Sequence, residues 1–302
     1  MRIVSLSPSA TEMICAIGLG DQLCGITHEC DYPASVLALP KMTRSSIPSN
    51  ASSSEIDRLV SQQADGGIAL YALDIEALKA IEPDVIVTQT LCDVCAVAKS
   101  DVLLAVKQLP REPKIINLSP LSLGDMLNDL VFLGRILGCE RQAIDAVNSL
   151  TARIQEVTNR SGLMKHRPTV VLLEWIDPPF SAGHWNPELV RLAGAHEQIG
   201  REGAKSRRFP WQELLQVDPE MMVIACCGYS AQRSYADISI LRSYPSFADL
   251  QSVRNRRVFI ADGSSYFNRP GPRLVDSLEL LAHAIDSKSH PLSGQLAPLA
   301  SI

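Results

Sequence analysis

The sequence predicts an α/β protein with two lobes, each built on a mostly parallel central sheet, and a long α-helix that joins them. The main observation is a repeat. Residues 76–88 and 213–225 each read as a short amphipathic helix, an acid-Pro-acid stop and an apolar run. The apolar runs are too short for a core helix and lack polar alternation, which is typical of strands buried on both faces of a parallel sheet. A helical pattern between the two copies, at residues 141–159, would extend for roughly 30 Å, enough to join two lobes.

The first lobe is expected at residues 1–120 and opens on a core strand at residues 3–6. The next helix, at 10–17, is expected to begin with Ser9 as its N-cap and Glu12 completing a capping box. Gly18 is expected to end it. The remaining elements follow in order: a strand at 23–27, a Ser- and Pro-rich surface excursion over 40–70 with a short helix at 55–62, the first repeat, a helix at 98–109 and a strand at 114–118.

Residues 121–165 are expected to be helical and to include the helix that joins the lobes. Ser122 and Asp125 mark the start of the first helix there, and Gly138 marks its end. The second lobe is expected at residues 166–302. Its elements are predicted in this order: a strand at 169–173, a helix at 187–193, the second repeat, a mobile stretch at 228–238, a strand at 258–261, a helix at 273–285 and a frayed tail after residue 287.

The composition excludes several classes of protein. The chain has 302 residues, 46% of them hydrophobic, and a net charge of −5. This is typical of a core-forming globular protein, and it argues against nucleic-acid binding, which favours basic surfaces. No apolar run reaches the ~20 residues that would span a bilayer, so no membrane insertion is expected. The chain is expected to be a monomer.

The cysteines and the N-terminus bear on the compartment. Several of the eight cysteines lie in apolar contexts that suit buried free thiols, and this fits a reducing compartment. No secretory signal precedes the first predicted strand. A cytoplasmic protein is therefore expected from the sequence as given, and a periplasmic one if a signal has been removed.

Turns that follow predicted strands are the candidate ligand sites, because open α/β sheets bind ligands beyond the carboxyl ends of their strands. One of them carries Trp175, His184 and Trp185, although only 5% of the chain is aromatic. The cluster predicts a stacking surface for a large planar ligand, and an aromatic cluster that caps the lobe is the structural alternative. The turns that stand out are residues 7–9, 27–33, 89–95, 174–185 and 266–270.

Stretches in these turns are similar to those of a known family. They are residues 5–12 (SLSPSATE), 28–33 (HECDYP), 91–96 (LCDVCA), 174–175 (EW) with 183–185 (GHW), 211–213 (WQE) and 267–273 (FNRPGPR). From Arg2 to about Ile285 the chain resembles the cobalamin-binding solute-binding proteins of ABC importers. These are periplasmic-binding-protein-like, with two Rossmann-like lobes and a rigid interlobe helix. The motifs are specific only as a set.

The resemblance implies that cobalamin or another corrinoid lies in a cleft between the lobes. A corrin ring offers a face for indole rings and a rim of amides for an arginine. One wall departs from the pattern, because Gln89 and Thr90 stand where relatives carry an aromatic residue, so a different corrinoid or ligand is an alternative. The candidate ligand-binding residues are Pro8, Tyr71, Trp175, His184, Trp185, Trp211 and Arg269.

The resemblance also implies a permease partner. In docking relatives one acidic residue of each lobe pairs with arginine on the permease, and Glu76 and Glu213 match those positions. The alternative is that both are ordinary solvated carboxylates on helices. A store or chaperone for corrinoid inside the cell is the alternative role for a chain without a signal.

Cys92 and Cys95 form a Cys-x-x-Cys pair, which is half of a zinc site. Completing it takes two more ligands, for which His28, Cys30, His184 and Cys226 are the candidates. A redox dithiol and packed structural thiols are the other interpretations. The neutral imidazole of His28 or His184 is also a candidate ligand for the cobalt of a corrinoid, with a simple hydrogen-bonding role as the alternative.

No catalytic motif stands out, since the chain contains neither a phosphate-binding Gly-x-x-x-x-Gly-Lys loop nor a Gly-x-Ser-x-Gly elbow. A binding protein, not an enzyme, is therefore expected, with a corrinoid as its ligand. One alternative is an iron chelate or haem, for which Arg269, Arg207 and Arg208 are the basic side chains. Another is a cytoplasmic metal- or thiol-dependent enzyme that uses Cys92 and Cys95.

Overall fold

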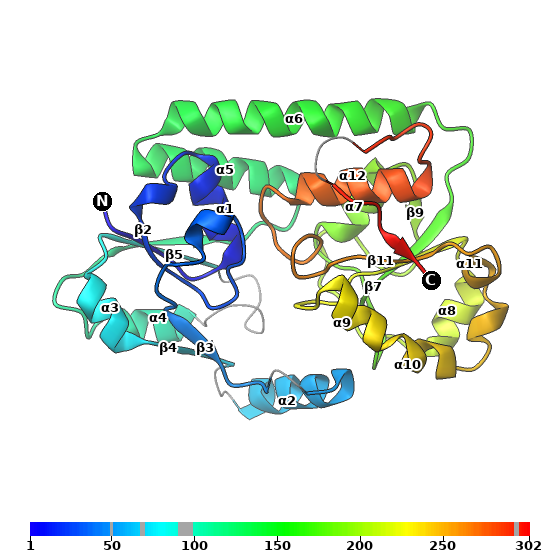
Figure 1. Ribbon diagram of the computed structural model, residues 1–302, viewed down its shortest axis with the longest axis horizontal. Helices are drawn as coiled ribbons and strands as arrows, with labels where there is room; N and C mark the ends of the chain where they lie inside the picture. Colours follow the sequence, from blue (N-terminus) through cyan, green and yellow to red (C-terminus); the bar gives the residue numbers. More distant parts are fainter. Residues whose placement is uncertain (49–50, 67–69, 90–98, 293–295) are drawn as a thin grey trace. The chain divides into compact units, whose positions relative to one another are not determined.

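The structure is a computed structural model that describes residues 1–48, 51–66, 70–89, 99–292 and 296–302. The chain divides into two compact units. The first comprises Met1–Pro120 with Gly124–Val147, and the second comprises Leu121–Leu123 with Asn148–Ile302. Each unit has its own sheet with parallel strands, and helices pack around it (Figure 1). The predicted α/β class with parallel central sheets is confirmed.

The first unit is built on a parallel sheet with the strand order β2-β1-β5-β6. Ile3 of β1 pairs with Val85 of β5, and every residue of β5 is buried. The apolar run without alternation therefore forms a strand covered on both faces, as the sequence predicted. The strands are β1 (Ile3–Ser5), β2 (Leu23–Ile26), β5 (Val85–Gln89) and β6 (Lys114–Leu118).

A small antiparallel sheet forms between one strand within the region predicted as a surface excursion, residues 40–70, and one strand directly after it. Its strands are β3 (Thr43–Ser45) and β4 (Tyr71–Leu73). Strands this short carry too little alternation to be recognised, and their partners are far apart in the sequence. The helices of the unit are α1 (Pro8–Ala16), α2 (Ser53–Gly66), α3 (Ile75–Ile81), α4 (Lys99–Val106) and α5 (Leu123–Leu137), with short 3-10 helices at Gly20–Gln22 and Ala34–Val36.

The prediction that Ser9 caps α1 is wrong. Ser7 is the N-cap, and its hydroxyl accepts a hydrogen bond from the N–H of Ala10 at 3.2 Å. Pro8 then occupies the first helical position, where its missing N–H costs nothing and its fixed φ suits the helix. Ser9 is released from capping, and its hydroxyl donates to the side-chain oxygen of Gln89 at 3.1 Å instead.

The second unit is built on a mixed sheet with the strand order β12-β11-β10-β7-β8, and β9 also pairs with β7. The pairs β7–β10, β10–β11 and β7–β9 are parallel, whereas the edge strands β8 and β12 are antiparallel. The strands are β7 (Thr169–Trp175), β8 (Phe180–Ser181), β9 (His196–Glu197), β10 (Met221–Ile224), β11 (Val258–Ile260) and β12 (Ala300–Ser301).

Two predictions for this unit are wrong. The stretch at 228–238 contains helix α9, which Ser230 caps by accepting the N–H of Arg233. The tail is not frayed throughout, since Ser301 of β12 pairs with Phe259 of β11. The helices are α6 (Glu140–Gly162, with residues in both units), α7 (Asn186–Leu192), α8 (Trp211–Val217), α9 (Ala231–Ala236), α10 (Ile238–Ser243), α11 (Gln251–Arg254) and α12 (Leu274–Ile285), with a 3-10 helix at Phe247–Asp249.

The repeat noted in the sequence is also a repeat of backbone conformation. Helices α3 and α8 end at Glu82 and Asp218, the residues before the two prolines, with φ of +47° and +38°. Each residue donates its N–H to the carbonyl of the leucine four residues earlier. Proline disfavours a helical conformation in the residue before it, and a left-handed residue is a standard way to end a helix. In the described part of the chain, no helix is long and apolar enough to cross a membrane.

Candidate functional site

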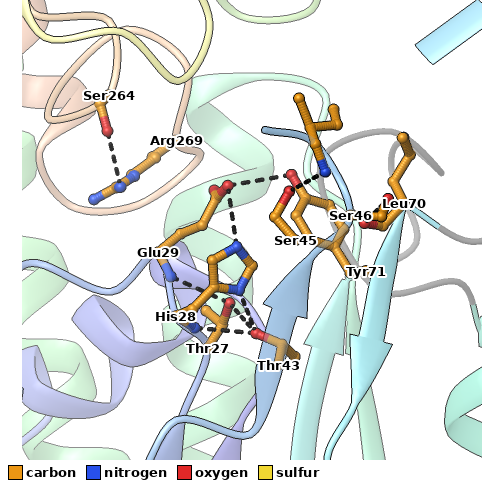
Figure 2. Close-up of polar contacts among 11 residues, drawn as sticks. Thr27, His28, Glu29, Thr43, Ser45, Ser46, Leu70, Tyr71, Ser264 and Arg269 are labelled. Atoms are coloured by element: carbon orange, nitrogen blue, oxygen red, sulfur yellow. Dashed lines mark hydrogen bonds and ion pairs between the residues drawn. The ribbon is translucent and has the colours of Figure 1, made fainter. Parts of the chain in front are cut away.

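In the first unit, polar residues gather where β2 ends and β3 and β4 pair. The side chain of His28 contacts the Thr43 hydroxyl through Nδ1 at 2.7 Å, and the same hydroxyl lies 2.8 Å from that of Thr27. Tyr71 of β4 donates its hydroxyl to Oε1 of Glu29 at 3.2 Å, and its ring lies 5.3 Å from that of His28 (Figure 2). Tyr71, a predicted ligand contact, is thus positioned by a network that the sequence did not reveal.

The electrostatics of His28 favour a neutral imidazole. Burial lowers its pKa, Glu29 raises it and Lys41 lowers it, with a net downward shift. A neutral ring can accept a hydrogen bond or a metal through one nitrogen while the other is held by a partner. Cys92 and Cys95, the other residues of the zinc hypothesis, lie outside the described residues. Among the residues that are described, no three His, Cys, Asp or Glu side chains are grouped so as to hold a metal ion.

Pro8 lies at the start of α1, directly after β1, and is half-buried. Its neighbours Ser7 and Ser9 lie 3.2 Å apart through their hydroxyls, and Ser9 continues the contact to Gln89 at the end of β5. The polar Gln89, which replaces the expected aromatic residue, is therefore bonded to the turn that carries Pro8. The carboxyl ends of β1 and β5 meet at this turn.

In the second unit, Trp175 ends strand β7 and packs against Tyr229, with ring centroids 4.8 Å apart. The Trp175 indole donates its N–H to the carbonyl of Asp177 at 3.1 Å. Tyr229 also contacts Arg233, whose guanidinium lies 4.5 Å from the ring centroid and is bonded to Asp237 at 2.6 Å. The result is a half-buried indole at the carboxyl end of the sheet, supported by a fixed tyrosine.

Arg269 is connected by hydrogen bonds to Tyr229, the residue that packs against Trp175. Its guanidinium donates to the Ser264 hydroxyl at 3.1 Å (Figure 2). The Ser264 N–H in turn donates to the carbonyl of Tyr229 at 3.0 Å. Asn268 anchors the loop by donating to the carbonyl of Ala225, just beyond β10. Trp175 and Arg269, far apart in the sequence, are thus linked through Tyr229 and Ser264 at the carboxyl ends of β7, β10 and β11.

Trp211 also lies in the region of Trp175, but its side chain is buried. It begins α8, stacks on Tyr244 with centroids 4.4 Å apart, and donates its indole N–H to the carbonyl of Pro245 at 2.8 Å. The Tyr244 hydroxyl lies 3.5 Å from the Asp177 carboxylate, next to Trp175. Burial, the charge of Asp177 and this contact raise the pKa of Tyr244 to about 12. Trp211 therefore supports the segment after Trp175, and its role as a ligand contact stays a prediction.

His184 and Trp185 form a separate pair in this unit. Trp185 is buried and donates its indole N–H to the carbonyl of Phe267 at 2.7 Å, which ties it to the loop that carries Arg269. His184 has a φ of +50° and stacks on Trp185 with centroids 5.5 Å apart. Burial lowers its pKa, as does the charge of Lys205. Its Nε2 atom is buried without a hydrogen-bond partner in the described part of the chain.

The two predicted docking carboxylates are both engaged within their own units. Glu76 is highly exposed and forms an ion pair with Lys79 at 2.9 Å on α3. The carboxylate of Glu213, on α8, accepts hydrogen bonds from both terminal guanidinium nitrogens of Arg207. Arg208, the neighbouring base, lies over the ring of Phe180 at 5.6 Å. A partner arginine at Glu213 would have to compete with Arg207.

Several residues that build the site were not predicted from the sequence. Tyr229 and Arg233 lie in the stretch taken as mobile, although the sequence Gly228-Tyr229-Ser230 is a turn signal followed by a helix cap. Glu29 lies in the turn at 27–33 that the sequence singled out, but its contact to Tyr71 was not predicted, and Thr43 and Tyr244 carried no signal beyond residue type. The second unit presents a half-buried indole that is linked through Tyr229 and Ser264 to a guanidinium. Such a combination suits binding of a planar ligand with hydrogen-bond acceptors.

Comparison with known proteins identifies the family to which this architecture belongs. The family described as periplasmic binding protein matches residues 3–264 of the chain. The chain belongs to the periplasmic binding protein family. The resemblance seen in the motifs is thereby confirmed at the level of the family, which is one of binding proteins and not of enzymes.

Relatives of this periplasmic binding protein differ in the ligand they are named for. The vitamin B12-binding protein of Vibrio cholerae serotype O1 is 22% identical over 281 residues, which cover 92% of this chain and 86% of the relative. The solved periplasmic vitamin B12 binding protein BtuF of Vibrio cholerae has a TM-score of 0.68 at 19% identity and covers 96% and 98% of the two chains. A periplasmic heme binding protein from Pseudomonas aeruginosa has a TM-score of 0.73 at 20% identity, covering 99% and 97%.

Proposed function

We propose that this periplasmic binding protein binds cobalamin or a related corrinoid and that Trp175, Tyr229 and Arg269 form its contact surface in the second unit. The observation that carries the proposal is the link from Trp175 to Arg269 through Tyr229 and Ser264 at the carboxyl ends of parallel strands. The vitamin B12-binding relative supports the choice of ligand. A ligand held between two lobes, with Pro8 and Tyr71 as further contacts, stays a prediction.

The chemistry of the surface suits a corrinoid. The half-buried indole of Trp175 offers an apolar face on which a macrocycle stacks, and Tyr229 and Arg233 hold that face in place, so little conformational entropy is lost on binding. Arg269 is mostly buried, and its guanidinium has five N–H donors in a fixed fork. A guanidinium of this geometry suits the amide oxygens on the rim of a corrin, which are hydrogen-bond acceptors.

A role in import follows as part of the proposal. We place the protein as the substrate-binding component of an ABC importer, with Glu76 and Glu213 facing a permease. Glu213 would exchange Arg207 for a permease arginine, at little cost because an exposed ion pair contributes only about 0–1 kcal/mol. The solved relatives named as periplasmic support the envelope as its compartment. Cell fractionation tests this, and recovery in the cytoplasm would leave the intracellular carrier as the role.

Haem is the second candidate ligand. The similarity to a periplasmic heme binding protein from Pseudomonas aeruginosa supports it. Haem carries two propionates and would need cations at the rim of the site. Arg208, whose guanidinium lies over the ring of Phe180, and Arg207, which is bonded to Glu213, are the cations that this ligand would use.

Competition between the two ligands tests the proposal. Purified protein is titrated with cyanocobalamin by calorimetry, first alone and then after saturation with hemin. The proposal predicts a dissociation constant of about 1 µM or tighter for cyanocobalamin, with hemin unable to displace it at equal concentration. Absence of heat and of a spectral change well above that concentration would rule out the corrinoid, and tight hemin binding would select the second candidate.

A further inference from the structure

The second unit contains a cavity of about 580 Å³ that is separate from the Trp175 surface. Pro168 and Arg257 immediately precede β7 and β11, so the cavity lies at the amino ends of these strands, whereas Trp175 ends β7. Its volume falls within the ~300–1,000 Å³ typical of small-molecule sites. It is lined by Arg160, Leu163, Met164, Lys165, His166, Pro168, Arg257, Ile285, Asp286 and Ser289.

The lining is basic although the chain is acidic. Three lining side chains carry full positive charges, Arg160, Lys165 and Arg257, and one carries a negative charge, Asp286. The chain as a whole has a net charge of −5. Cations concentrated in a concave surface of an acidic protein attract anions to that surface.

The acid in the cavity does not neutralise these cations. Both oxygens of Asp286 are used within its own turn, where Oδ2 accepts the Ser289 hydroxyl at 2.6 Å and Oδ1 accepts the Lys288 N–H at 3.1 Å. The Ser289 hydroxyl hydrogen bond is the largest cause of a lowered pKa for Asp286, so the carboxyl stays charged and satisfied. Asp286 is the C-cap of α12, and its carboxylate is occupied by these local contacts and not by the bases that line the cavity.

Two of the bases have no acidic partner within ion-pairing distance in the described part of the chain. Arg257 donates to the carbonyl of Ile285 at 3.0 Å and to the sulfur of Met221 at 3.7 Å, and its charge helps to lower the pKa of Glu220, which lies beyond ion-pairing distance. Lys165 forms no ion pair with a described residue. The others are engaged, since Arg160 pairs with Glu156 at 2.5 Å and His166 lies 2.7 Å from Glu220. A half-buried guanidinium with unused donors is a natural seat for an anionic group.

An apolar wall accompanies the bases. Leu163 is 84% exposed and lines the cavity together with Met164, Pro168 and Ile285. We propose that this cavity binds a small organic anion, with its phosphate or carboxylate held by Arg257 and Lys165 and its apolar chain packed on Leu163 and Met164. The proposal does not depend on the corrinoid, because it concerns the opposite ends of the strands.

Hexyl phosphate is the probe, with inorganic phosphate and hexanol as its two halves. Binding is followed by calorimetry and by the methyl resonances of the chain's seven methionines. We expect hexyl phosphate to bind about tenfold more tightly than either half and to shift the Met164 methyl resonance, assigned with Met164→Leu. Equal affinity for inorganic phosphate, a shift confined to other methionines, or no saturable binding at about 10 mM would each overturn the proposal.

Charge-removing variants locate the anion. Lys165→Gln and Arg257→Gln are each expected to weaken hexyl phosphate by about tenfold, and Arg254→Gln, an exposed arginine on the neighbouring α11, is the matched control that should change nothing. Lys165 is exposed and its variant should fold normally, which keeps the test decisive if Arg257→Gln loses stability. Unchanged binding in Lys165→Gln would contradict the assigned anion position.

Discussion

The carboxylate of Asp84 accepts a hydrogen bond from the backbone N–H of Arg2 at 2.7 Å, one residue before β1 begins. Glu220 does the same in the second unit, where it accepts the N–H of Thr169 at 3.0 Å at the start of β7. Both acids directly follow the prolines of the repeat. The acid-Pro-acid signature therefore has two functions: its first acid ends the helix and its second anchors the first strand of the same unit.

Asp84→Asn is expected to lower the melting temperature at pH 7. The Arg2 N–H is the largest cause of a lowered pKa for Asp84, assisted by Arg111. An acid whose pKa is lower in the folded state stabilises it above the unfolded value of about 4, and this contribution is lost as the pH falls below it. Thermal melts of both proteins at pH 7 and pH 3 check this, and a difference in melting temperature that does not shrink at pH 3 would contradict it.

The sequence predicted most of this architecture because the repeat is carried by strong local signals. Prolines, buried apolar runs and glycines at helix ends act within a few residues, so β5, β10 and the ends of α3 and α8 could be predicted. The strands β3, β4, β8, β9 and β12 could not, since each is two or three residues long and is stabilised by a partner distant in the sequence.

The candidate site was predicted less completely. Trp175 and Arg269 could be identified from residue type and motif, but the residues that connect them, Tyr229 and Ser264, could not. A stretch rich in small and polar residues looks mobile in sequence, yet Arg233 holds it by a contact to Tyr229 and an ion pair to Asp237. Side-chain contacts of this kind do not produce a periodic pattern in the sequence, so they could not be predicted from it.

Trp211→Ala is expected to reduce the free energy of unfolding by about 3–5 kcal/mol, because it removes a buried indole stacked on Tyr244. Trp175→Ala removes a half-buried ring and should cost distinctly less. Urea unfolding of both variants measures the difference. Equal losses would mean that Trp175 is as much a core residue as Trp211 and would weaken its role as a ligand surface.

Arg153 joins α6 to α12 inside the second unit, with contacts to Glu279 at 2.7 Å and Asp276 at 2.5 Å. Because the arginine side chain is 35% exposed, Arg153→Met is expected to cost about 1–3 kcal/mol, less than a fully buried pair. Arg135→Met, which breaks the exposed pair with Glu140, is the control and should cost under about 0.5 kcal/mol.

The Arg153 variant also carries a pH signature. Burial already raises the pKa of Asp276, and the hydrogen bond and charge of Arg153 oppose that rise. Without the arginine the carboxyl is harder to ionise, so the loss of stability should be larger at pH 7 than at pH 4. A loss that is the same at both values, measured by urea unfolding, would show that packing alone is involved.

Glu197 should make stability fall as the pH rises. Burial raises its pKa to about 7, although its oxygens accept the N–H groups of Leu172, Ile199 and Gly200. An unfolded glutamic acid loses its proton near 4.3, so between these values the folded chain binds more protons and loses stability with rising pH. Unfolding free energies at pH 5 and pH 8 should show this slope in the wild type and a smaller slope in Glu197→Gln. Identical slopes would refute it.

The most direct test of the corrinoid surface is the dissociation constant of cyanocobalamin for the wild type and for Trp175→Ala, measured by calorimetry on proteins first shown to be folded. If the indole of Trp175 is a central contact, its removal should weaken binding by about 2 kcal/mol, roughly 30-fold. Arg254→Ala, on the exposed face of α11, should bind as the wild type does. Equal affinities for wild type and Trp175→Ala would contradict the assignment of this surface to the ligand.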